Sequence, residues 1–469
     1  MERPGRTPDL SFLMAFTPPY PCPHKNKSSF ILRFTRGWHS WLHILFEKSY
    51  RMKMGQVKIF GGNLFMVNEP KLVRQMLQEQ PKKYPKHEML TYLLEPLLGT
   101  SIFTTNGEVW ERQRRLVDVG FQQARMQLVF PLMTSAVEEM VKRLDTVADG
   151  RSYEVDGEMT YVTADVMFRT ILSENLTETD ANEVYEAFLE FQNHFQKVLM
   201  LMMYRLPVYF ARRKAAKAAR RIRAPLEAII ARRYKEREEG KTEPKQDILG
   251  AIMEAVDPVA GDQFSYSEMV DQICMLFLAG HETSASALAW ATYMISNSPE
   301  IQERMREEIE REVGDRDFEY GDARKLRLVY NVFRETLRLY PPVGFFIRQA
   351  TETHCMRDKT VEKGSPIMIS PWLIQRHREH WERPDEFDPD RFETQAGKES
   401  AKCAYIPFST GPRVCIGQSF ANQEAVLILA TLVRRYRIEP VPEHVPQTTG
   451  RVTVRSDNGI RVRFHKRNP

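Results

Sequence analysis

The chain has 469 residues, of which 42% are hydrophobic and 28% are charged, a balance typical of a folded globular protein and not of a disordered one. Lys and Arg number 67 against 62 Asp and Glu, so the net charge of +5 gives no support for nucleic-acid binding. The five cysteines are odd in number and form no CxxC pair, which disfavours a disulfide framework and a zinc ribbon. A chain of this length can bury a core large enough to hold a cofactor.

The first 39 residues are predicted to be an N-terminal extension, followed by a single domain at 40–469 without repeats or long linkers. An apolar run from Leu10 to Phe16 is closed by Pro18 and Pro19. It is too short to span a bilayer and lacks the layout of a signal peptide. We therefore expect no transmembrane anchor and a cytoplasmic location.

In chain order, the patterns predict a mainly α fold with a small β portion (α+β). The stretch QVKIFGGNLFMV (56–67) contains two β-prone runs around a Gly-Gly-Asn turn and indicates a hairpin. Helical patterns dominate residues 106–340, whereas 343–375 looks extended and irregular. Residues 418–437 are again predicted to be helical.

The longest helix is predicted to begin at the capping box Ser265-x-x-Glu268 and to extend for about 45 Å. It is apolar nearly all round, so we expect it to be central and buried. Its middle reads AGHETS (279–284), where Gly weakens the helix by about 1 kcal/mol and Thr283 can bond back to the carbonyl four residues earlier. Two interpretations stand: small residues that allow close helix packing, or an acid and a hydroxyl that handle protons beside a substrate.

The stretch FSTGPRVCIGQSF (408–420) holds one cysteine between two glycines. A helix expected from Gln418 directs its positive end at Cys415, which lowers a thiol pKa. No histidine at 381–443 offers a base for a nucleophile, and one cysteine cannot hold an iron–sulfur cluster. The thiol is therefore an inert buried cysteine or the one protein ligand of a metal carried by a cofactor such as haem.

Three further patterns in the sequence do not indicate a function when each is taken alone. The pair Glu335 and Arg338, at i and i+3, is most often a surface salt bridge. Trp110 and Arg114 would usually be one core aromatic and one surface cation. The Pro-rich stretch HREHWERPDEFDPDRF (377–392) contains two histidines but no third ligand at metal-binding spacing.

Together these patterns, in their order and spacing, resemble the cytochrome P450 family over about residues 40–465. Trp110-x-x-x-Arg114 matches the haem-propionate helix of the family, and AGHETS (279–284) matches its oxygen-activating helix. Glu335-x-x-Arg338, with Arg391, matches the structural ion-pair network. Phe408-x-x-Gly411-x-Arg413-x-Cys415-x-Gly417 matches the haem-binding signature. Ser284 stands where the family commonly has Thr, which keeps a hydroxyl.

The resemblance implies a haem b cofactor and a role for each matching residue. Cys415 would be the axial ligand of the haem iron, and Thr283 and Glu282 would deliver protons during oxygen activation. Phe408 and Gly417 would complete the cofactor-binding loop. The expected partners of the haem propionates are Trp110, Arg114, Arg348 and Arg413, and the expected structural network is Glu335, Arg338 and Arg391.

The resemblance also implies a monooxygenase that inserts one atom of O2 into a substrate. The expected pocket residues are Leu94, Ala279, Val343 and Phe345, which favour a lipophilic substrate such as a fatty acid, terpenoid or carotenoid that is hydroxylated. The Met-rich segment 198–210 would lie near the entrance, or is plain core packing. The basic segment ARRKAAKAARRIR (211–223) is either a solvated helix face or a contact with anionic lipid headgroups.

Electrons are expected from a separate partner, because the chain has no nucleotide-binding glycine motif. Arg112, Arg114 and Arg115, with Arg413, are predicted to form a basic face for an acidic ferredoxin or flavodoxin and its reductase. Two alternatives stay open: a haem-thiolate peroxygenase or isomerase, and a haem sensor without catalysis. The Glu282–Thr283 pair counts against the first, and the absence of an output domain counts against the second.

Overall fold

The computed structural model describes residues 16–26, 28–59, 62–176, 178–240 and 245–467. Its helices are α1 (Phe30–Gly37), α2 (Pro70–Arg74), α3 (Glu88–Leu98), α4 (Gly107–Asp118), α5 (Gln123–Asp145), α6 (Val155–Met167), α7 (Glu178–Met203), α8 (Tyr209–Glu238), α9 (Ile248–Glu254), α10 (Tyr266–Ser296), α11 (Pro299–Glu312), α12 (Arg327–Leu339), α13 (Pro371–Ile374), α14 (Gln395–Ala404) and α15 (Gln418–Arg435). Its strands are β1 (Met54–Ile59), β2 (Gly62–Val67), β3 (Asp149–Glu154), β4 (Phe346–Gln349), β5 (His354–Met356), β6 (Lys359–Val361), β7 (Pro366–Ile369), β8 (Tyr436–Pro440), β9 (Thr448–Gly450), β10 (Val454–Ser456) and β11 (Arg461–Lys466). The predicted mainly α fold with a small β portion is confirmed.

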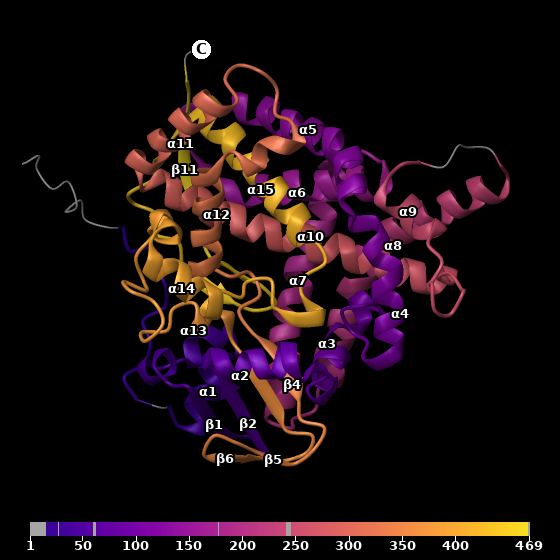
Figure 1. Ribbon diagram of the computed structural model, residues 1–469, viewed down its shortest axis with the longest axis vertical. Helices are drawn as coiled ribbons and strands as arrows, with labels where there is room; N and C mark the ends of the chain where they lie inside the picture. The colour runs from indigo at the N-terminus through magenta and orange to yellow at the C-terminus, as the bar shows by residue number, and fades with distance from the viewer. Residues whose placement is uncertain (1–15, 27, 60–61, 177, 241–244, 468–469) are drawn as a thin grey trace, which may run out of the picture.

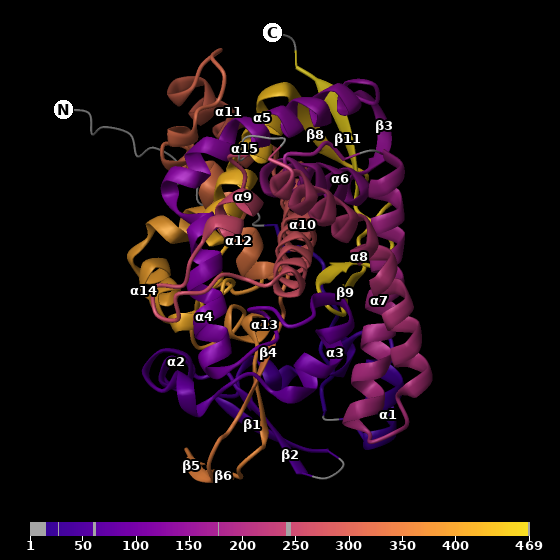
Figure 2. The same ribbon diagram turned by 90° about the vertical axis from the view of Figure 1, so that its right-hand side faces the viewer.

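Two small sheets lie at opposite ends of the long axis, and helices fill the space between them (Figures 1 and 2). One sheet has the strand order β1-β2-β7-β4, in which β2 and β7 are parallel and the other neighbours antiparallel. The other is the antiparallel sheet β3-β11-β8. The predicted hairpin is confirmed as β1 and β2, and the predicted extended region contains β4 to β7.

The helix α10 runs through the middle of the molecule, where other helices cover it on several sides (Figures 1 and 2). The predicted capping box is present: the Glu268 amide donates to Ser265 Oγ at 3.3 Å, and the Ser265 amide donates to Glu268 Oε2 at 2.9 Å. Nearly all of its side chains are buried, as the unbroken apolar pattern predicts. The exceptions near its middle are Ala279, Gly280 and Thr283, which lie one turn apart on one face and are accessible.

The N-terminal segment packs on the rest of the chain from Phe16 onward. The Phe16 carbonyl accepts a hydrogen bond from the Phe387 amide at 2.9 Å. Pro19 offers its carbonyl to the hydroxyl groups of Tyr340 and Thr448. The predicted boundary between residues 39 and 40 therefore falls inside a packed region, while most of the apolar run before Phe16 lies outside the described residues.

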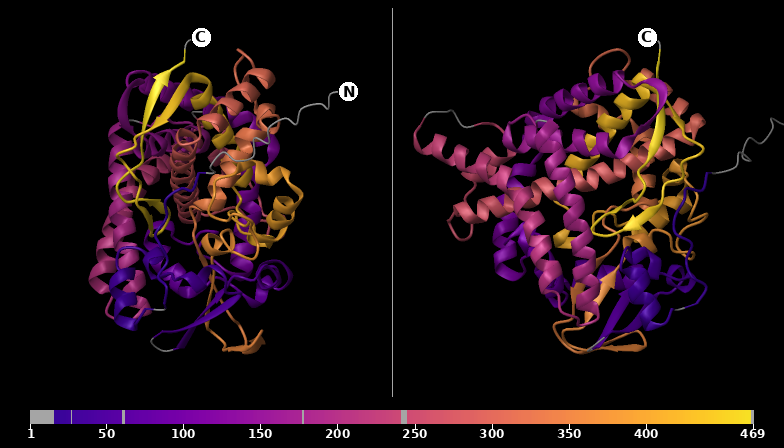
Figure 3. Two further views of the ribbon diagram at one scale, coloured as in Figure 1. Left: turned by 90° about the vertical axis from the view of Figure 1, so that its left-hand side faces the viewer. Right: turned by 180° about the vertical axis from the view of Figure 1, so that it is seen from behind.

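None of the described helices is both long enough and apolar enough to cross a bilayer. The antiparallel pair α7 and α8 forms one flank of the molecule, and α1 lies at the end of that pair (Figures 2 and 3). Gln196 on α7 donates to the Gly37 carbonyl at 2.6 Å, which fixes α1 against the C-terminal part of α7.

We expect Ser265→Ala to lower the free energy of unfolding by about 1 kcal/mol, because the first turn of α10 loses its side-chain cap. Ser267 is exposed in the same turn, so Ser267→Ala is a matched control and should change stability by less than about 0.5 kcal/mol. Denaturant unfolding of both variants measures the difference, and equal effects would contradict the capping role.

Candidate active site

A tight loop from Phe408 to Gly417 presents Cys415 at the start of α15. The Cys415 amide donates to the Phe408 carbonyl at 2.9 Å and closes the loop. Gly411 has φ +76°, and a Cβ there would lie 1.9 Å from the Leu77 carbonyl oxygen, so only glycine fits. At Gly417, in contrast, a Cβ would meet no atom within 4 Å, which leaves open space beside the thiol.

The Cys415 side chain is accessible, although protein surrounds the loop that carries it. Burial raises the pKa of the thiol, and the Gly417 amide and the Arg114 guanidinium act in the opposite direction. The predicted net lowering of this pKa is therefore not seen for the free thiol, because desolvation outweighs the helix end. Coordination to a metal ion deprotonates a thiol directly, so a bound metal would reverse this balance.

Thr283 lies on the accessible face of α10 and makes the bond predicted for it. Its Oγ1 donates to the Ala279 carbonyl at 2.7 Å, and the Gly280 carbonyl lies at 3.4 Å. Thr163 on α6 donates to the His281 carbonyl at 3.0 Å. The weak point of the helix thus has carbonyl groups that side chains satisfy, and Thr283 keeps a hydroxyl beside an internal opening.

Glu282 lies on another side of α10, where it is buried in a hydrogen-bonded network, and its predicted role in proton delivery stays a prediction. Its Oε1 accepts from Gln192 Nε2 at 3.1 Å, from Thr453 Oγ1 at 2.8 Å and from Arg455 Nε at 2.7 Å. Its Oε2 accepts from Arg455 Nη2 at 2.7 Å. Adjacent helix residues point about 100° apart, so Glu282 contacts α7 and β10 while Thr283 faces the opening.

Buried and half-buried cations gather near the cysteine loop, and none of them forms an ion pair with a carboxylate of the described residues. The Arg348 side chain on β4 is buried, and within the described part of the chain its nearest polar or aromatic contact is the Phe346 ring, 5.9 Å away. Arg413 donates to the Thr105 carbonyl and Asn106 Oδ1 at 3.1 and 3.0 Å and lies 4.1 Å above the Trp110 ring. Burial lowers the pKa of Arg348 to about 10 and, with repulsion from Arg348, that of Arg413 to about 9.

Lys86 belongs to the same group of cations, although no motif in the sequence marks it. Its backbone forms a bridge with Arg348, and its Nζ donates to the Ile102 carbonyl at 3.3 Å and to the Phe103 carbonyl. Burial, followed by repulsion from Arg413, Arg348 and Arg114, holds the pKa of Lys86 well below its usual value. An anionic group at this position would relieve that repulsion.

Arg114 is placed differently from Arg348 and Arg413. Its Nε donates to Asp118 Oδ1 at 2.8 Å, and its Nη1 donates to the Val414 carbonyl at 2.8 Å. It therefore braces the residue before Cys415 and already has a carboxylate partner. Within this group, the arginine without a partner among the described residues is Arg348.

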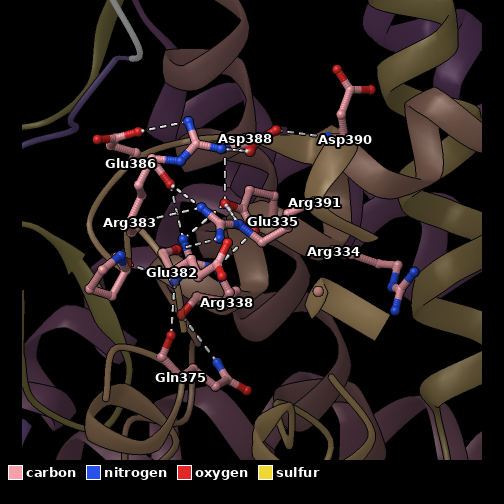
Figure 4. Close-up of polar contacts among 12 residues, drawn as sticks. Arg334, Glu335, Arg338, Gln375, Glu382, Arg383, Glu386, Asp388, Asp390 and Arg391 are labelled. Atoms are coloured by element: carbon pink, nitrogen blue, oxygen red, sulfur yellow. Dashed lines mark hydrogen bonds and ion pairs between the residues drawn. The ribbon is translucent and has the colours of Figure 1, made fainter. Parts of the chain in front are cut away.

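Glu335 on α12 forms the predicted ion-pair network, and all three members are buried (Figure 4). Arg338 donates from Nε and Nη2 to the two carboxylate oxygens at 2.8 Å, and Arg391 Nε donates to Oε1 at 2.8 Å. Arg338 also donates to the carbonyls of Gln375, Pro384 and Glu386, so all five of its donors are used.

Gln375 connects this network to the cysteine loop. Its Nε2 donates to the Leu337 carbonyl at 2.8 Å, and its Oε1 accepts from the Ile406 amide at 2.9 Å. Ile406 precedes Phe408 by two residues. The buried ion pairs therefore fix the segment that leads to Cys415.

A mainly apolar cavity of about 400 Å³ has Phe345 and Ile347 in its lining. It extends past Trp41 to residues 199–205 at the Met-rich end of α7, and the role of this segment as an entrance stays a prediction. Of the four predicted pocket residues, Phe345 lines this cavity. Leu94 is buried in the core, Val343 is half-buried and Ala279 is accessible on α10, and none of these three lines it.

The predicted basic face on the cysteine side is largely neutralised. Arg112 pairs with Asp262 and Glu268 at 2.9 and 2.8 Å, and Arg115 pairs with Asp257 at 2.6 Å. These carboxylates lie some 140 or more residues further along the chain, so the local charge pattern does not show them. Arg112 and Arg115 therefore do not offer unpaired positive charge to an acidic protein partner.

We expect Arg338→Lys to lower the free energy of unfolding by about 3–5 kcal/mol, because lysine cannot replace the paired guanidinium bonds to buried Glu335. Arg304→Lys is the matched control: its pair with Asp390, at 2.8 Å, is largely exposed and should cost less than about 1 kcal/mol. Denaturant unfolding compares the two, and an equally small loss in both would contradict the role of the network.

The geometry fits a cofactor that brings both a metal and carboxylate groups. Cys415 offers a single accessible thiol and open space lies beside Gly417. Arg348, Arg413 and Lys86 are buried or half-buried cations, and none of them forms an ion pair with a carboxylate of the described residues. Within the described residues, no cluster of three or more His, Cys, Asp or Glu is present that would hold a bare metal ion.

Comparisons with known proteins agree with this geometry. The chain is 30% identical to "Cyclooctatin synthase" of Streptomyces melanosporofaciens over 81% of each protein, and 28% identical to "Protein LUTEIN DEFICIENT 5, chloroplastic" of Arabidopsis thaliana over 87% of the chain and 71% of that protein. It is 30% identical to "Probable cytochrome P450 4s3" of Drosophila melanogaster over 89% and 87%.

Among solved structures, the haem domain of cytochrome P450DA has the same fold, with a TM-score of 0.78 at 22% identity, covering 89% of this chain and 90% of that one. The family profile described as Cytochrome P450 matches residues 30–462. The protein belongs to the cytochrome P450 family, and it is an oxidoreductase whose cofactor is haem.

Proposed function

We propose that this cytochrome P450 hydroxylates a lipophilic substrate, with Cys415 as the axial ligand of the haem iron. The observation that carries the proposal is the accessible thiol on a glycine-bounded loop, beside cations that form no ion pair with a carboxylate of the described residues. Haem would supply a redox-active iron for oxygen chemistry, and the Cys415 thiolate would supply the electron density that favours O–O cleavage.

Some of the proposed cofactor-binding residues would contact the haem carboxylates, and others would hold those residues in position. Arg348, Arg413 and Lys86 would meet the haem carboxylates, and planar guanidinium donors suit carboxylates in a buried site. Trp110 stacks under Arg413 and fixes its direction. Arg114 would act indirectly, because it holds the Val414 carbonyl and so the position of the neighbouring thiol.

Thr283 is the proposed polar group on the oxygen side of the site. Its hydroxyl donates to the Ala279 carbonyl and keeps lone pairs that can accept from a substrate group or water. Donation of the hydroxyl proton during catalysis requires that Thr283 receive a replacement proton from another group. Glu282 is poorly suited to that task, because its oxygens already accept four hydrogen bonds.

The apolar cavity supports a lipophilic substrate. Its lining includes Trp41, Leu45, Phe345 and several methionines beside polar residues such as Lys58 and Glu362, and methionine adapts to ligands of varied shape. Two relatives carry names that refer to lutein and to cyclooctatin, which supports the same class. A ferredoxin or flavodoxin remains the proposed electron donor, docking by contacts other than Arg112 and Arg115.

A peripheral contact with an anionic membrane would bring such substrates to the cavity. Exposed apolar side chains lie next in sequence to residues that line it: Ile31 and Leu32 on α1, Leu206 after α7, and Tyr209 and Phe210 at the start of α8. The rings of Phe34 and Tyr204, 4.7 Å apart, join the two segments. Exposed cations then follow along α8 at i, i+4 and i+7: Arg213, Lys217 and Arg220. Apolar tips flanked by cations are typical of surfaces that bind acidic lipids.

We expect carbon monoxide added to the reduced holoprotein to give the red-shifted Soret band of thiolate ligation, and Cys415→Ser to abolish that band. Cys403→Ser is the matched control, because Cys403 is an accessible thiol on α14 outside the loop. Persistence of the band in Cys415→Ser would refute the ligand assignment.

We expect Phe210→Ser to weaken cosedimentation of the holoprotein with vesicles that contain anionic phospholipid. Phe210 is 78% exposed and Val259, on a distant loop, is 77% exposed, so Val259→Ser removes an equally exposed apolar group as a control. Lys217→Gln combined with Arg220→Gln should weaken binding to anionic vesicles without creating binding to neutral ones. Equal binding by all variants would exclude this surface.

A further inference from the structure

The mainly apolar cavity beside Phe345 also carries charged groups that a hydrocarbon substrate would not use. Its described lining contains four cations and one carboxylate: Arg33, Lys58, Arg205 and Lys363, and Glu362. Four cations against one carboxylate leave an excess of three positive charges at a single cavity. Such an excess favours a ligand that brings negative charge.

The cations come from separate elements that meet at one end of the molecule. Lys58 lies near the end of β1, opposite Asn63 on β2, and Lys363 lies in the turn between β6 and β7. Strands β2 and β7 are parallel, with Phe65 opposite Ile367, so the residues that precede the two strands lie side by side. The other two cations lie on α1 and just after α7, at the same end of the molecule (Figure 2).

The exposure of the lining separates a charged outer end from a more apolar inner end. Lys58, Arg205 and Lys363 are exposed, which places them at the outer end, and we call this end the rim. Ile347 is buried in the same lining and directly precedes Arg348, the proposed partner of a haem carboxylate. A ligand therefore meets positive charge at the rim and hydrocarbon further in, beside the strand that carries Arg348.

The two rim lysines are available to a charged ligand. Neither Lys58 nor Lys363 forms an ion pair with a carboxylate of the described residues. Arg112 and Arg115 on α4 differ in this respect, because carboxylates from another part of the chain pair with both. Lysine carries its charge on a flexible stem, so the two rim lysines can turn toward one anion.

Contact with acidic lipid headgroups is a second use for cations, but the placement of the rim cations favours it less. The cations proposed for that contact repeat along one face of α8: Arg213, Lys217 and Arg220. The rim cations come instead from three different parts of the chain and line one cavity. A row of cations on one helix face is typical of membrane contact, whereas cations at the mouth of an apolar cavity fit one head group.

We propose that the substrate is a long-chain amphiphile whose acidic head group lies at the rim beside Lys58 and Lys363, with its hydrocarbon chain directed toward Ile347. The head group is a carboxylate or a phosphate monoester, since both carry the negative charge that the rim lacks. The inference rests on the proposed lipophilic substrate and adds the charge of its head group and its direction in the cavity.

Calorimetric titration of the holoprotein tests the head group with probes that share one alkyl chain: dodecanoate, dodecyl phosphate, dodecanol and dodecyltrimethylammonium, each below its micelle concentration. We expect at least one acidic probe to bind about tenfold more tightly than the alcohol, and the cationic probe to bind most weakly. Added salt should reduce the advantage of the acid over the alcohol, because exposed charges are screened. The tighter of the two acidic probes identifies the head group.

Substitutions at the rim test the residues. Lys58→Gln combined with Lys363→Gln should remove most of the advantage of the acid and leave the affinity for dodecanol unchanged. Glu362→Gln should strengthen binding of the acid, because it removes the negative charge at the rim. Lys402→Gln is the matched control: Lys402 is exposed on α14 and does not line the cavity, so both affinities should stay as in the wild type.

The outcomes separate this inference from the proposed function. Equal affinities for the acids and the alcohol, or an advantage of the acid that survives the double substitution, would overturn the acidic head group while lipophilic binding stands. If none of the probes binds, the proposed lipophilic substrate fails as well. A double variant that loses binding to anionic vesicles but keeps the affinity of the wild type for the acid would assign the rim to membrane contact and refute the proposal.

Discussion

The Glu335 carboxylate carries two guanidinium groups in a region that water does not reach, and the segment leading to Cys415 is built on that contact. Removing either partner would leave an unpaired buried charge, so each cation is held to its place. Because Arg338 also binds three carbonyl groups at 375–386, the loop cannot shift without exposing that charge. Gln375 extends the constraint to Ile406, next to the cysteine loop.

A second group of charges, near the cysteine loop, consists of cations that have no carboxylate ion-pair partner among the described residues. Arg348, Arg413 and Lys86 repel one another, and burial lowers the pKa of each. Such an arrangement is unfavourable in the protein alone, and on the proposed assignment the carboxylates of haem would relieve it. Binding of the cofactor would then be coupled to the stability of the folded chain on this side of the site. The network at Glu335, whose charges are all paired, holds the cysteine loop in place independently of the cofactor.

The local parts of the fold could be predicted from the sequence. The capping box at Ser265 locates the start of α10 because both of its hydrogen bonds lie within four residues. Contacts between distant segments could not be predicted in this way. Asp257 and Asp262, which neutralise the predicted basic face, are far from their arginines in the chain. Lys86 carries no motif, and only the β bridge to Arg348 brings it into the cationic group.

The role of Glu282 in proton delivery stays a prediction, but the surroundings of its side chain could not be predicted from the motif. The motif places an acid beside Thr283 in sequence, but one residue on a helix is a turn of about 100°, which is enough to send the carboxylate toward α7 and β10. There it pairs with Arg455, a buried cation that also acts on the Asp156 carboxyl. Thr163 and Thr283 meanwhile bond carbonyls at the weak point of α10, so neighbouring residues of one helical turn serve separate purposes.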